Sequence, residues 1–288
     1  MAETKTHTLD VPGAVLTYDV RGGDGGDAPV LLIIGSPMGA AGFATLAGHF
    51  TDRTVVTYDP RGAERSRSTD GATENSPDKH ADDLHRLITE LGVGPVEIFA
   101  SSGGAVNGLA LVARHPEQVR TLVAHEPPAA RELPDAVAAI AACVAIHDTY
   151  LRDGFGPAMA RFIALVSLDG PIPDGYADQP GPDPAAFGLP AADDGTRDNP
   201  LLGMNMPSCA DHRHDFAALR AAPTRVVIGV GAQSARMMAG RAGTAVAERL
   251  GTTPVTFPGG HDGFSGGEYG GMGEPDAFAA TLREVLGG

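Results

Sequence analysis

The chain has 288 residues, of which 42% are hydrophobic and 20% charged, a composition that excludes a disordered chain and predicts one large folded domain with room for an insertion. Its 36 acidic residues outnumber the 21 basic ones. The resulting net charge of −15 argues against nucleic acid and anionic membranes as partners and indicates a charge that keeps the protein in solution.

The first residues and the cysteines indicate in which cellular compartment the protein is expected. Cys143 and Cys209 show no metal-type spacing, which favours a reduced, intracellular protein. The polar start MAETKTHTLDV lacks the apolar segment of a signal peptide, and the run at 30–34 is too short to cross a bilayer. We therefore expect a cytoplasmic protein without a membrane partner. A homo-oligomer is possible, but nothing in the sequence indicates one.

Short apolar runs alternate with helical patterns along the chain. The runs predict strands at 30–34, 54–58, 96–99, 119–124, 224–230 and 254–257, and the helical patterns cover 76–92, 104–114, 241–250 and 276–285. Ser76 and Gly92 are suited to begin and end the first of these helices. Because the strands are continuously apolar, they predict an α/β fold with a mostly parallel sheet covered by helices on both faces.

The stretch 127–222 breaks this alternation. Alanine-rich helical patterns at 136–150 and 157–168 are followed by an irregular segment, 169–200, that is dense in glycine, proline and aspartate. Long irregular loops of this kind often cover active sites, although a surface excursion without a role is the alternative. We expect a core made of residues 1–126 and 223–288, with 127–222 inserted as a helical lid.

Two adjacent serines follow the strand at 96–99. A nucleophile on a tight strand-to-helix turn needs small residues two positions before and two positions after it. Phe99 breaks this requirement for Ser101, whereas Ser102 is flanked by Ala100 and Gly104. The following helix also directs its free N–H groups toward developing negative charge. Ser102 is therefore the candidate nucleophile, with an ordinary serine–glycine turn as the alternative.

These features together resemble the α/β-hydrolase fold family over nearly the whole chain. The resemblance rests on LLIIGSP (31–37), YDPRGAERS (58–66), the serine turn, RHPEQVR (114–120) and FPGGH (257–261). It implies a doubly wound, mostly parallel sheet with a lid inserted after the sixth strand. It also implies a structural role for Tyr58, Asp59 and Arg61, because the family uses that turn to tie loops around the nucleophile.

An oxyanion hole needs two N–H donors directed at the oxygen that becomes charged. Gly103 follows the nucleophile and supplies one donor. The loop after the first predicted strand should supply the other, and Pro37 has no N–H, so Ser36 is preferred and Met38 is the fallback. The family often has histidine where Ile34 stands, so a side chain that shapes this loop is missing.

His261 matches the catalytic histidine of the family in position, and glycines flank it. A histidine on an ordinary surface loop is the alternative. His212 and His214 look like a metal pair, but positions i and i+2 share a face only on a strand. The polar segment that contains them is not typical of a strand. We expect them on a solvated part of the lid and predict neither a metal site nor a cofactor.

The acid is not where much of the family has it, because Ser234 stands there. Glu126 lies at the C-terminal end of the strand at 119–124, where catalytic groups gather in open α/β sheets, and some branches of the family place their acid there. Asp262 adjoins His261 in sequence and is poorly placed to reach its ring. We predict a triad of Ser102, His261 and Glu126, with a dyad, or a glutamate satisfied by lid backbone or arginine, as the alternatives.

Serine at this turn favours acyl transfer over the alkyl chemistry that a carboxylate nucleophile performs. The leading hypothesis is a carboxylic ester hydrolase (EC 3.1.1 type) that acts on a small-molecule ester, thioester or lactone. A carbon–carbon bond hydrolase, a cofactor-free perhydrolase, an acyltransferase and a non-catalytic ligand binder stay open. The expected apolar substrate contacts are Met38, Met159, Phe162, Met204 and Met206, with core packing as the alternative for each.

Overall fold

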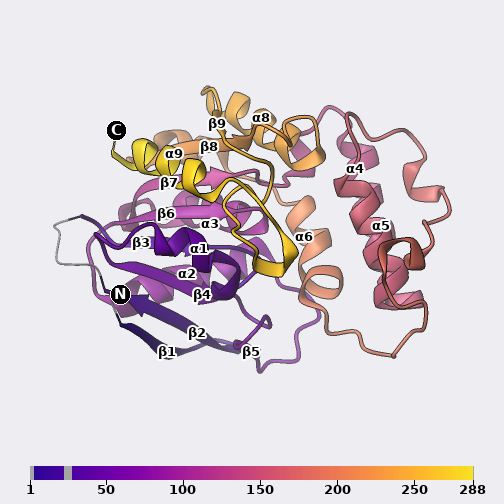
Figure 1. The fold of residues 1–288 in the computed structure, drawn as a ribbon, viewed down its shortest axis with the longest axis horizontal. Helices are drawn as coiled ribbons and strands as arrows, with labels where there is room; N and C mark the ends of the chain where they lie inside the picture. Colours follow the sequence, from indigo (N-terminus) through magenta and orange to yellow (C-terminus); the bar gives the residue numbers. More distant parts are fainter. Residues whose placement is uncertain (1–2, 23–27, 288) are drawn as a thin grey trace.

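The computed structural model describes residues 3–22 and 28–287, and within them nine strands form one sheet (Figure 1). Along the sheet the order is β1-β2-β4-β3-β6-β7-β8-β9, and β5 pairs with β2 off this path. The strands are β1 (Thr4–Val11), β2 (Ala14–Arg21), β3 (Leu31–Ile34), β4 (Val55–Asp59), β5 (Arg67–Ser68), β6 (Val96–Ser101), β7 (Val119–His125), β8 (Arg225–Gly231) and β9 (Val255–Phe257). The strands from β4 through β3 to β9 are all parallel, which confirms the predicted fold class.

The antiparallel hairpin of β1 and β2 was not among the predicted strands. Its register runs from Thr4 opposite Arg21 to Val11 opposite Ala14, and Gly13 takes a left-handed conformation (φ 77°) in the turn. β1 is almost entirely exposed, and most of its residues are polar, so it contains no continuous apolar run. A search for buried parallel strands therefore passes over it.

Helices cover both faces of the sheet. They are α1 (Ala44–Gly48), α2 (Pro77–Leu91), α3 (Gly103–Arg114), α4 (Ala136–Asp153), α5 (Phe155–Val166), α6 (Met206–Ala210), α7 (Phe216–Ala221), α8 (Met238–Leu250) and α9 (Pro275–Gly287). Side chains of α2, α3, α7 and α8 share one hydrophobic cluster with the sheet, and those of α1 and α9 share another. None of the described helices is long and apolar enough to cross a membrane.

The ends of α2 follow the sequence signals. The side chain of Ser76 accepts a hydrogen bond from the Lys79 N–H, which satisfies one of the free donors of the first turn. Gly92 ends the helix in a left-handed conformation (φ 63°) that costs glycine little. A side-chain cap of this kind contributes about 1 kcal/mol to helix stability.

The segment between β7 and β8 carries α4, α5, α6 and α7. Figure 1 shows α4, α5 and α6 set to one side of the sheet, and they have a hydrophobic cluster of their own. We call the part formed by α4 to α6 and their connections the cap. α7 instead packs against α3 and α8, with Phe216 and Leu219 in the core cluster of the sheet. The division of the chain at 127–222 stays a prediction.

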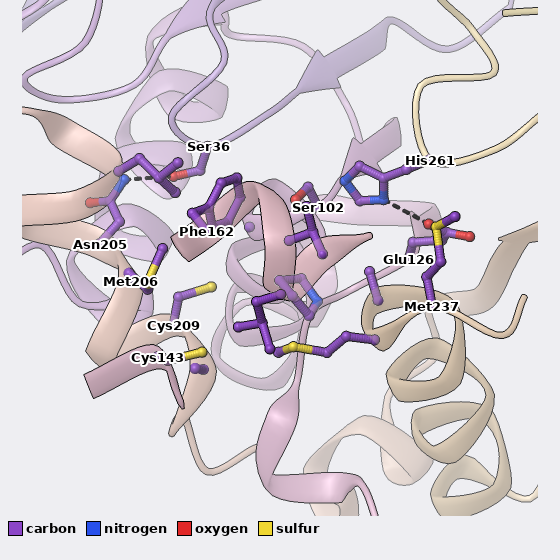
Figure 2. Close-up of a pocket in the computed structure, with 18 of the residues that line it drawn as sticks. Ser36, Ser102, Glu126, Cys143, Phe162, Asn205, Met206, Cys209, Met237 and His261 are labelled. Carbon is purple, nitrogen blue, oxygen red and sulfur yellow. Dashed lines mark hydrogen bonds and ion pairs between the residues drawn. The ribbon is translucent and has the colours of Figure 1, made fainter. Parts of the chain in front are cut away.

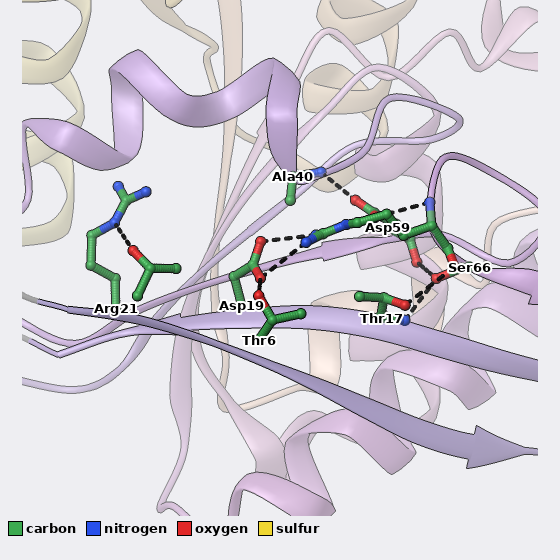
Figure 3. A network of polar contacts seen from close by, with 9 residues as sticks. Thr6, Thr17, Asp19, Arg21, Ala40, Asp59 and Ser66 are labelled. Carbon is green, nitrogen blue, oxygen red and sulfur yellow. Dashed lines mark hydrogen bonds and ion pairs between the residues drawn. The ribbon is translucent and has the colours of Figure 1, made fainter.

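A polar network anchors the loop that follows β3 (Figure 3). Asp59, at the end of β4, accepts a hydrogen bond from the Ala40 N–H at 2.8 Å, and its carboxylate also pairs with Arg65. The Ser66 hydroxyl donates to the Asp59 carbonyl and accepts from the Thr17 N–H on β2. These bonds connect β2 and the loop after β3 to one buried residue, Asp59, through its carboxylate and its backbone carbonyl, as the structural interpretation of this turn predicts.

His125, the last residue of β7, is fully buried in an aromatic cluster. Its ring centroid lies 5.2 Å from that of Phe278 and 5.5 Å from that of Phe257, and neither ring nitrogen has a hydrogen-bond partner among the described residues. Burial lowers the pKa of His125 to about 4, because a charged imidazolium cannot be solvated there. The folded protein therefore holds this ring neutral.

We predict that His125→Phe removes part of the acid sensitivity of the fold. Above pH 6.5 the ring is neutral in both states, whereas between pH 6.5 and about 4 only the unfolded chain binds the proton, so stability is lost as the pH falls. Between pH 7.5 and 5.5 the free energy of unfolding of the wild type should fall by about 1.4 kcal/mol more than that of the variant. Urea unfolding at the two pH values measures this difference.

The control is His7→Phe, because His7 is an exposed histidine on β1 that also lies against an aromatic ring, that of Tyr18. It should keep the wild-type dependence of stability on pH. Equal slopes for His125→Phe and the wild type would show that His125 becomes protonated in the folded protein as readily as in the unfolded chain.

Candidate active site

The turn between β6 and α3 holds Ser102 in a strained backbone conformation. Its φ of 57° and ψ of −128° are uncommon for a residue with a side chain. A methyl group on Gly104 would lie 2.8 Å from the Gly35 backbone, which explains the small residue at that position. Ser101 is buried, and its hydroxyl has no partner among the described residues. Ser102, by contrast, lines a cavity.

His261 and Glu126 are joined by a short hydrogen bond. The distance between His261 Nδ1 and Glu126 Oε2 is 2.6 Å. Figure 2 shows the His261 ring between Ser102 and Glu126, with its other nitrogen turned to the serine side. No hydrogen bond joins Ser102 to His261 in the described part of the chain. Catalytic hydrogen bonds of this kind often form only when substrate binds. The structure thus brings the three predicted residues together.

Glu126 directly follows β7 and is fully buried, with a left-handed backbone (φ 48°). Its other oxygen, Oε1, accepts from the Gly231 N–H at 2.8 Å and from the Ser234 hydroxyl at 2.5 Å. Burial by itself would raise the pKa of Glu126, but the bonds from His261 and Ser234 and the nearby imidazoles lower it to about 2. Its hydrogen-bond partners come from the sheet edge and the histidine, not from lid backbone or an arginine.

Ser234 occupies the position after β8 at which much of the family has its acid. Its hydroxyl donates to Glu126, so the residue at the position where the resemblance implies an acid is instead a hydrogen-bond partner of Glu126. Asp262 is exposed and makes no bond to the His261 ring, as its adjacency in sequence suggested. The carboxylate that contacts His261 therefore comes from β7.

Ser36 and Gly103, the predicted oxyanion donors, lie against one another. A methyl group on Gly103 would sit 2.6 Å from the Ser36 carbonyl oxygen and 3.4 Å from Ser36 Cβ. Gly103 is the first residue of α3, so its N–H has no acceptor within the helix. Both residues line the same cavity as Ser102, and Pro37 follows Ser36 without a donor of its own. The loop after β3 thus faces the helix N-terminus across the serine.

The cavity has a volume of about 510 Å³ and lies between the sheet edge and the cap. Phe162 and Met206 line it, as predicted. Met38, Met159 and Met204 are not among its lining residues: Met38 packs with the cluster under α1, and Met159 packs inside the cap. The other apolar lining residues are Pro77, Pro128, Cys143, Leu165, Val166, Leu201, Cys209, Ala210, Met237, Met238 and Ala239.

Several polar residues in the cavity wall were missed at the level of sequence, His80 and Asn205 among them. His80 lies on the buried face of α2, and Asn205 lies in the cap just before α6. His80 occupies the apolar stripe of its helix with Ala81 and Leu84, and a polar side chain in such a stripe is the signal that would have found it. Burial lowers the pKa of His80 to about 4, so the ring is neutral near pH 7.

His212 and His214 do not line the cavity. Their rings lie against each other at 4.9 Å between centroids, and both ring nitrogens of His214 are buried without a partner among the described residues. The expectation of a solvated segment therefore does not hold for His214. Its ring packs against Phe216 at the start of α7 instead, and burial lowers its pKa to about 3.

Comparisons of sequence support the same interpretation of the fold. Residues 28–168 match the family model of the alpha/beta hydrolase fold. The chain is 43% identical to the uncharacterized hydrolase YraK of Bacillus subtilis over 122 residues. This alignment covers 42% of this chain and 44% of that protein. A proline iminopeptidase of Xylella fastidiosa is 32% identical over 96 residues, or 33% of this chain and 31% of that protein. The chain thus aligns with less than half the length of these curated relatives.

Solved structures agree over almost the whole chain. The enol-lactonase from Burkholderia xenovorans LB400 superposes with a TM-score of 0.67 at 17% identity and covers 98% of this chain and 100% of that one. A thermophilic esterase from Thermogutta terrifontis gives 0.68 at 20% identity and covers 99% and 98%. At these identities the likeness concerns the fold. Together with the sequence match over residues 28–168, it shows that the chain has the α/β-hydrolase fold.

Proposed function

We propose that this protein is a serine hydrolase that cleaves carboxylic esters, thioesters or lactones through an acyl-enzyme. One observation carries the proposal: a strained serine that lines a cavity stands beside an imidazole whose far nitrogen is 2.6 Å from a buried carboxylate. That arrangement supplies a nucleophile, a base and a group that orients the base.

In the first half of the reaction, Ser102 Oγ attacks the substrate carbonyl while His261 Nε2 takes its proton. Glu126 holds the ring through Nδ1–H, which leaves Nε2 free to act as the base. Since the pKa of Glu126 is held near 2, the carboxylate is ionised and stabilises the imidazolium as it forms. The oxyanion then lies between the N–H groups of Gly103 and Ser36.

In the second half, the imidazolium returns its proton to the leaving group, which departs and leaves an acyl group on Ser102. Water enters, gives a proton to His261 and attacks the acyl carbonyl, so that the carboxylic acid is released and Ser102 recovers its hydrogen. Every atom transferred comes from substrate, water or these side chains. The atoms and protons of the reaction therefore balance with these groups alone.

The cavity favours an uncharged substrate of modest size. The charged side chains among its lining residues are Glu126 and Asp262, both acidic, and most of the remaining wall is apolar. A carboxylate on the substrate would therefore meet like charge and lose its hydration without compensation. A volume of about 510 Å³ accommodates a small or medium acyl compound.

We predict that the protein hydrolyses p-nitrophenyl acetate and butyrate and that Ser102→Ala lowers kcat/KM by at least about 10³-fold. Under rapid mixing the wild type should release a burst of p-nitrophenol equal to the enzyme concentration if deacylation is the slower step. Neutral esters should be cleaved at least about tenfold faster than a half-ester that carries a free carboxylate.

Ser101→Ala is the matched control, because it removes the neighbouring hydroxyl, which lies outside the cavity, and should keep activity. Turnover that survives Ser102→Ala would overturn the serine mechanism. A preference for the anionic ester would overturn only the substrate assignment.

We predict that Glu126→Gln lowers kcat by about 10²- to 10⁴-fold, because the amide favours the wrong imidazole tautomer and does not stabilise the imidazolium. Ser234→Ala leaves the carboxylate in place with one donor fewer and should cost about tenfold or less. Since Glu126 is ionised above about pH 2, its carboxylate should contribute no proton to the acid limb of kcat/KM.

Steady-state kinetics with circular dichroism as the check on folding measure these effects. Near-normal turnover in a folded Glu126→Gln protein would support a dyad in place of the triad. An acid limb that falls with two protons would show that Glu126 titrates in the working range.

A further inference from the structure

A chain of three buried polar side chains joins the cap to the loop after β3. Asn205, in the cap, donates from Nδ2 to Ser36 Oγ at 3.2 Å, and its Oδ1 lies 3.4 Å from His80 Nε2 on α2 (Figure 2). Ser36 is 9% exposed, Asn205 5% and His80 1%, and all three line the cavity. Buried polar groups with mutual bonds of this kind hold one another in a fixed geometry.

The hydrogens of this chain can be assigned from its members. A neutral His80 donates from Nε2 to the Asn205 carbonyl oxygen, which turns the amide nitrogen toward Ser36. Ser36 Oγ therefore accepts, and its own hydrogen is left over. Among the described residues that hydrogen has no acceptor, although the side chain is buried at the edge of the cavity.

The Ser36 side chain lies near the place where negative charge develops in the proposed reaction. Ser36 Cβ is 3.4 Å from the point that a methyl group on Gly103 would occupy, so the Ser36 side chain lies beside the first residue of α3. In the proposed mechanism the backbone N–H of the same residue is also directed at this oxygen. A third donor at this place would strengthen in the transition state, when the carbonyl oxygen becomes an oxyanion.

We propose that the Ser36 hydroxyl is a third donor of the oxyanion hole, and that Asn205 and His80 are positioning residues that hold it in the donating orientation. This inference rests on the proposed serine mechanism and adds a side chain to a hole otherwise built from backbone. It also makes the cap part of the catalytic site, because Asn205 belongs to the cap while Ser36 and His80 belong to the core.

The first test replaces the hydroxyl and keeps the backbone. Ser36→Ala retains the N–H of residue 36, so only the side-chain donor is lost. We expect kcat to fall about 10- to 100-fold with KM within about twofold, and Ser36→Thr to restore most of the loss. The affinity for a tetrahedral adduct, measured with an alkyl boronic acid, should fall in parallel, whereas the affinity for the product carboxylic acid should not change.

The second test concerns the positioning residues. Asn205→Ala should lower kcat by a smaller factor than Ser36→Ala, and Asn205→Asp by a larger factor than Asn205→Ala, because a carboxylate would draw the Ser36 hydrogen to itself. In the Ser36→Ala background neither change should lower kcat further. His80→Gln, which keeps a donor to Asn205, should be milder than His80→Leu, and thermal unfolding checks that each variant is folded.

The outcomes separate the two proposals. Activity that requires Ser102 but is unchanged in Ser36→Ala, or changed only in KM, overturns the third donor and leaves the hydrolase intact. Full additivity of Asn205→Ala with Ser36→Ala overturns the positioning role of Asn205. Activity that does not require Ser102 overturns the serine mechanism and the third donor together.

Discussion

A buried carboxylate at the end of β7 organises this structure. Glu126 is fully buried, so its charge is tolerated only because the Gly231 N–H, the Ser234 hydroxyl and the His261 ring all donate to it. Two of these donors lie just beyond β8 and β9, and the third ends β8. The requirement to satisfy one charge therefore fixes the relative positions of three loop regions, and with them the orientation of the imidazole.

The direction of the strands explains why these loops meet. In a parallel sheet all carboxyl ends lie at one edge, and functional side chains collect there. Ser36 follows β3, Ser102 follows β6, Glu126 follows β7, Ser234 follows β8 and His261 follows β9. Each is the contribution of one neighbouring strand in the order that the sheet sets. The antiparallel hairpin at the other side contributes no residue to the cavity, but it is tied to the loop after β3 through Asp59.

This dependence on the sheet edge also determines what can be predicted from sequence. Continuous apolar runs marked the parallel strands, small neighbours selected Ser102 over Ser101, and the absence of an acid at Ser234 led to Glu126. Each of these depends on local chain geometry or on strand order. Other features depend on how distant segments pack: the exposed strand β1, the packing of Met38 against the cluster under α1, and the His80–Asn205–Ser36 chain. Asn205 is 169 positions from Ser36 in the sequence, and the periodicity of apolar residues within a helix or strand does not indicate such a contact.

The two sides of the cavity differ in the way their polar groups are held. On the side of β7 and β8, a charged group is fixed by donors that belong to the core alone. On the side of β3, neutral groups are fixed by an amide from the cap. A shift of the cap would therefore leave the Glu126–His261 pair unchanged while it altered the environment of Ser36. The base and its acid are thus set by folding of the sheet, whereas the groups that face the developing oxyanion also depend on how the cap is seated. In the proposed mechanism, stabilisation of the transition state is the step at which cap and core act together.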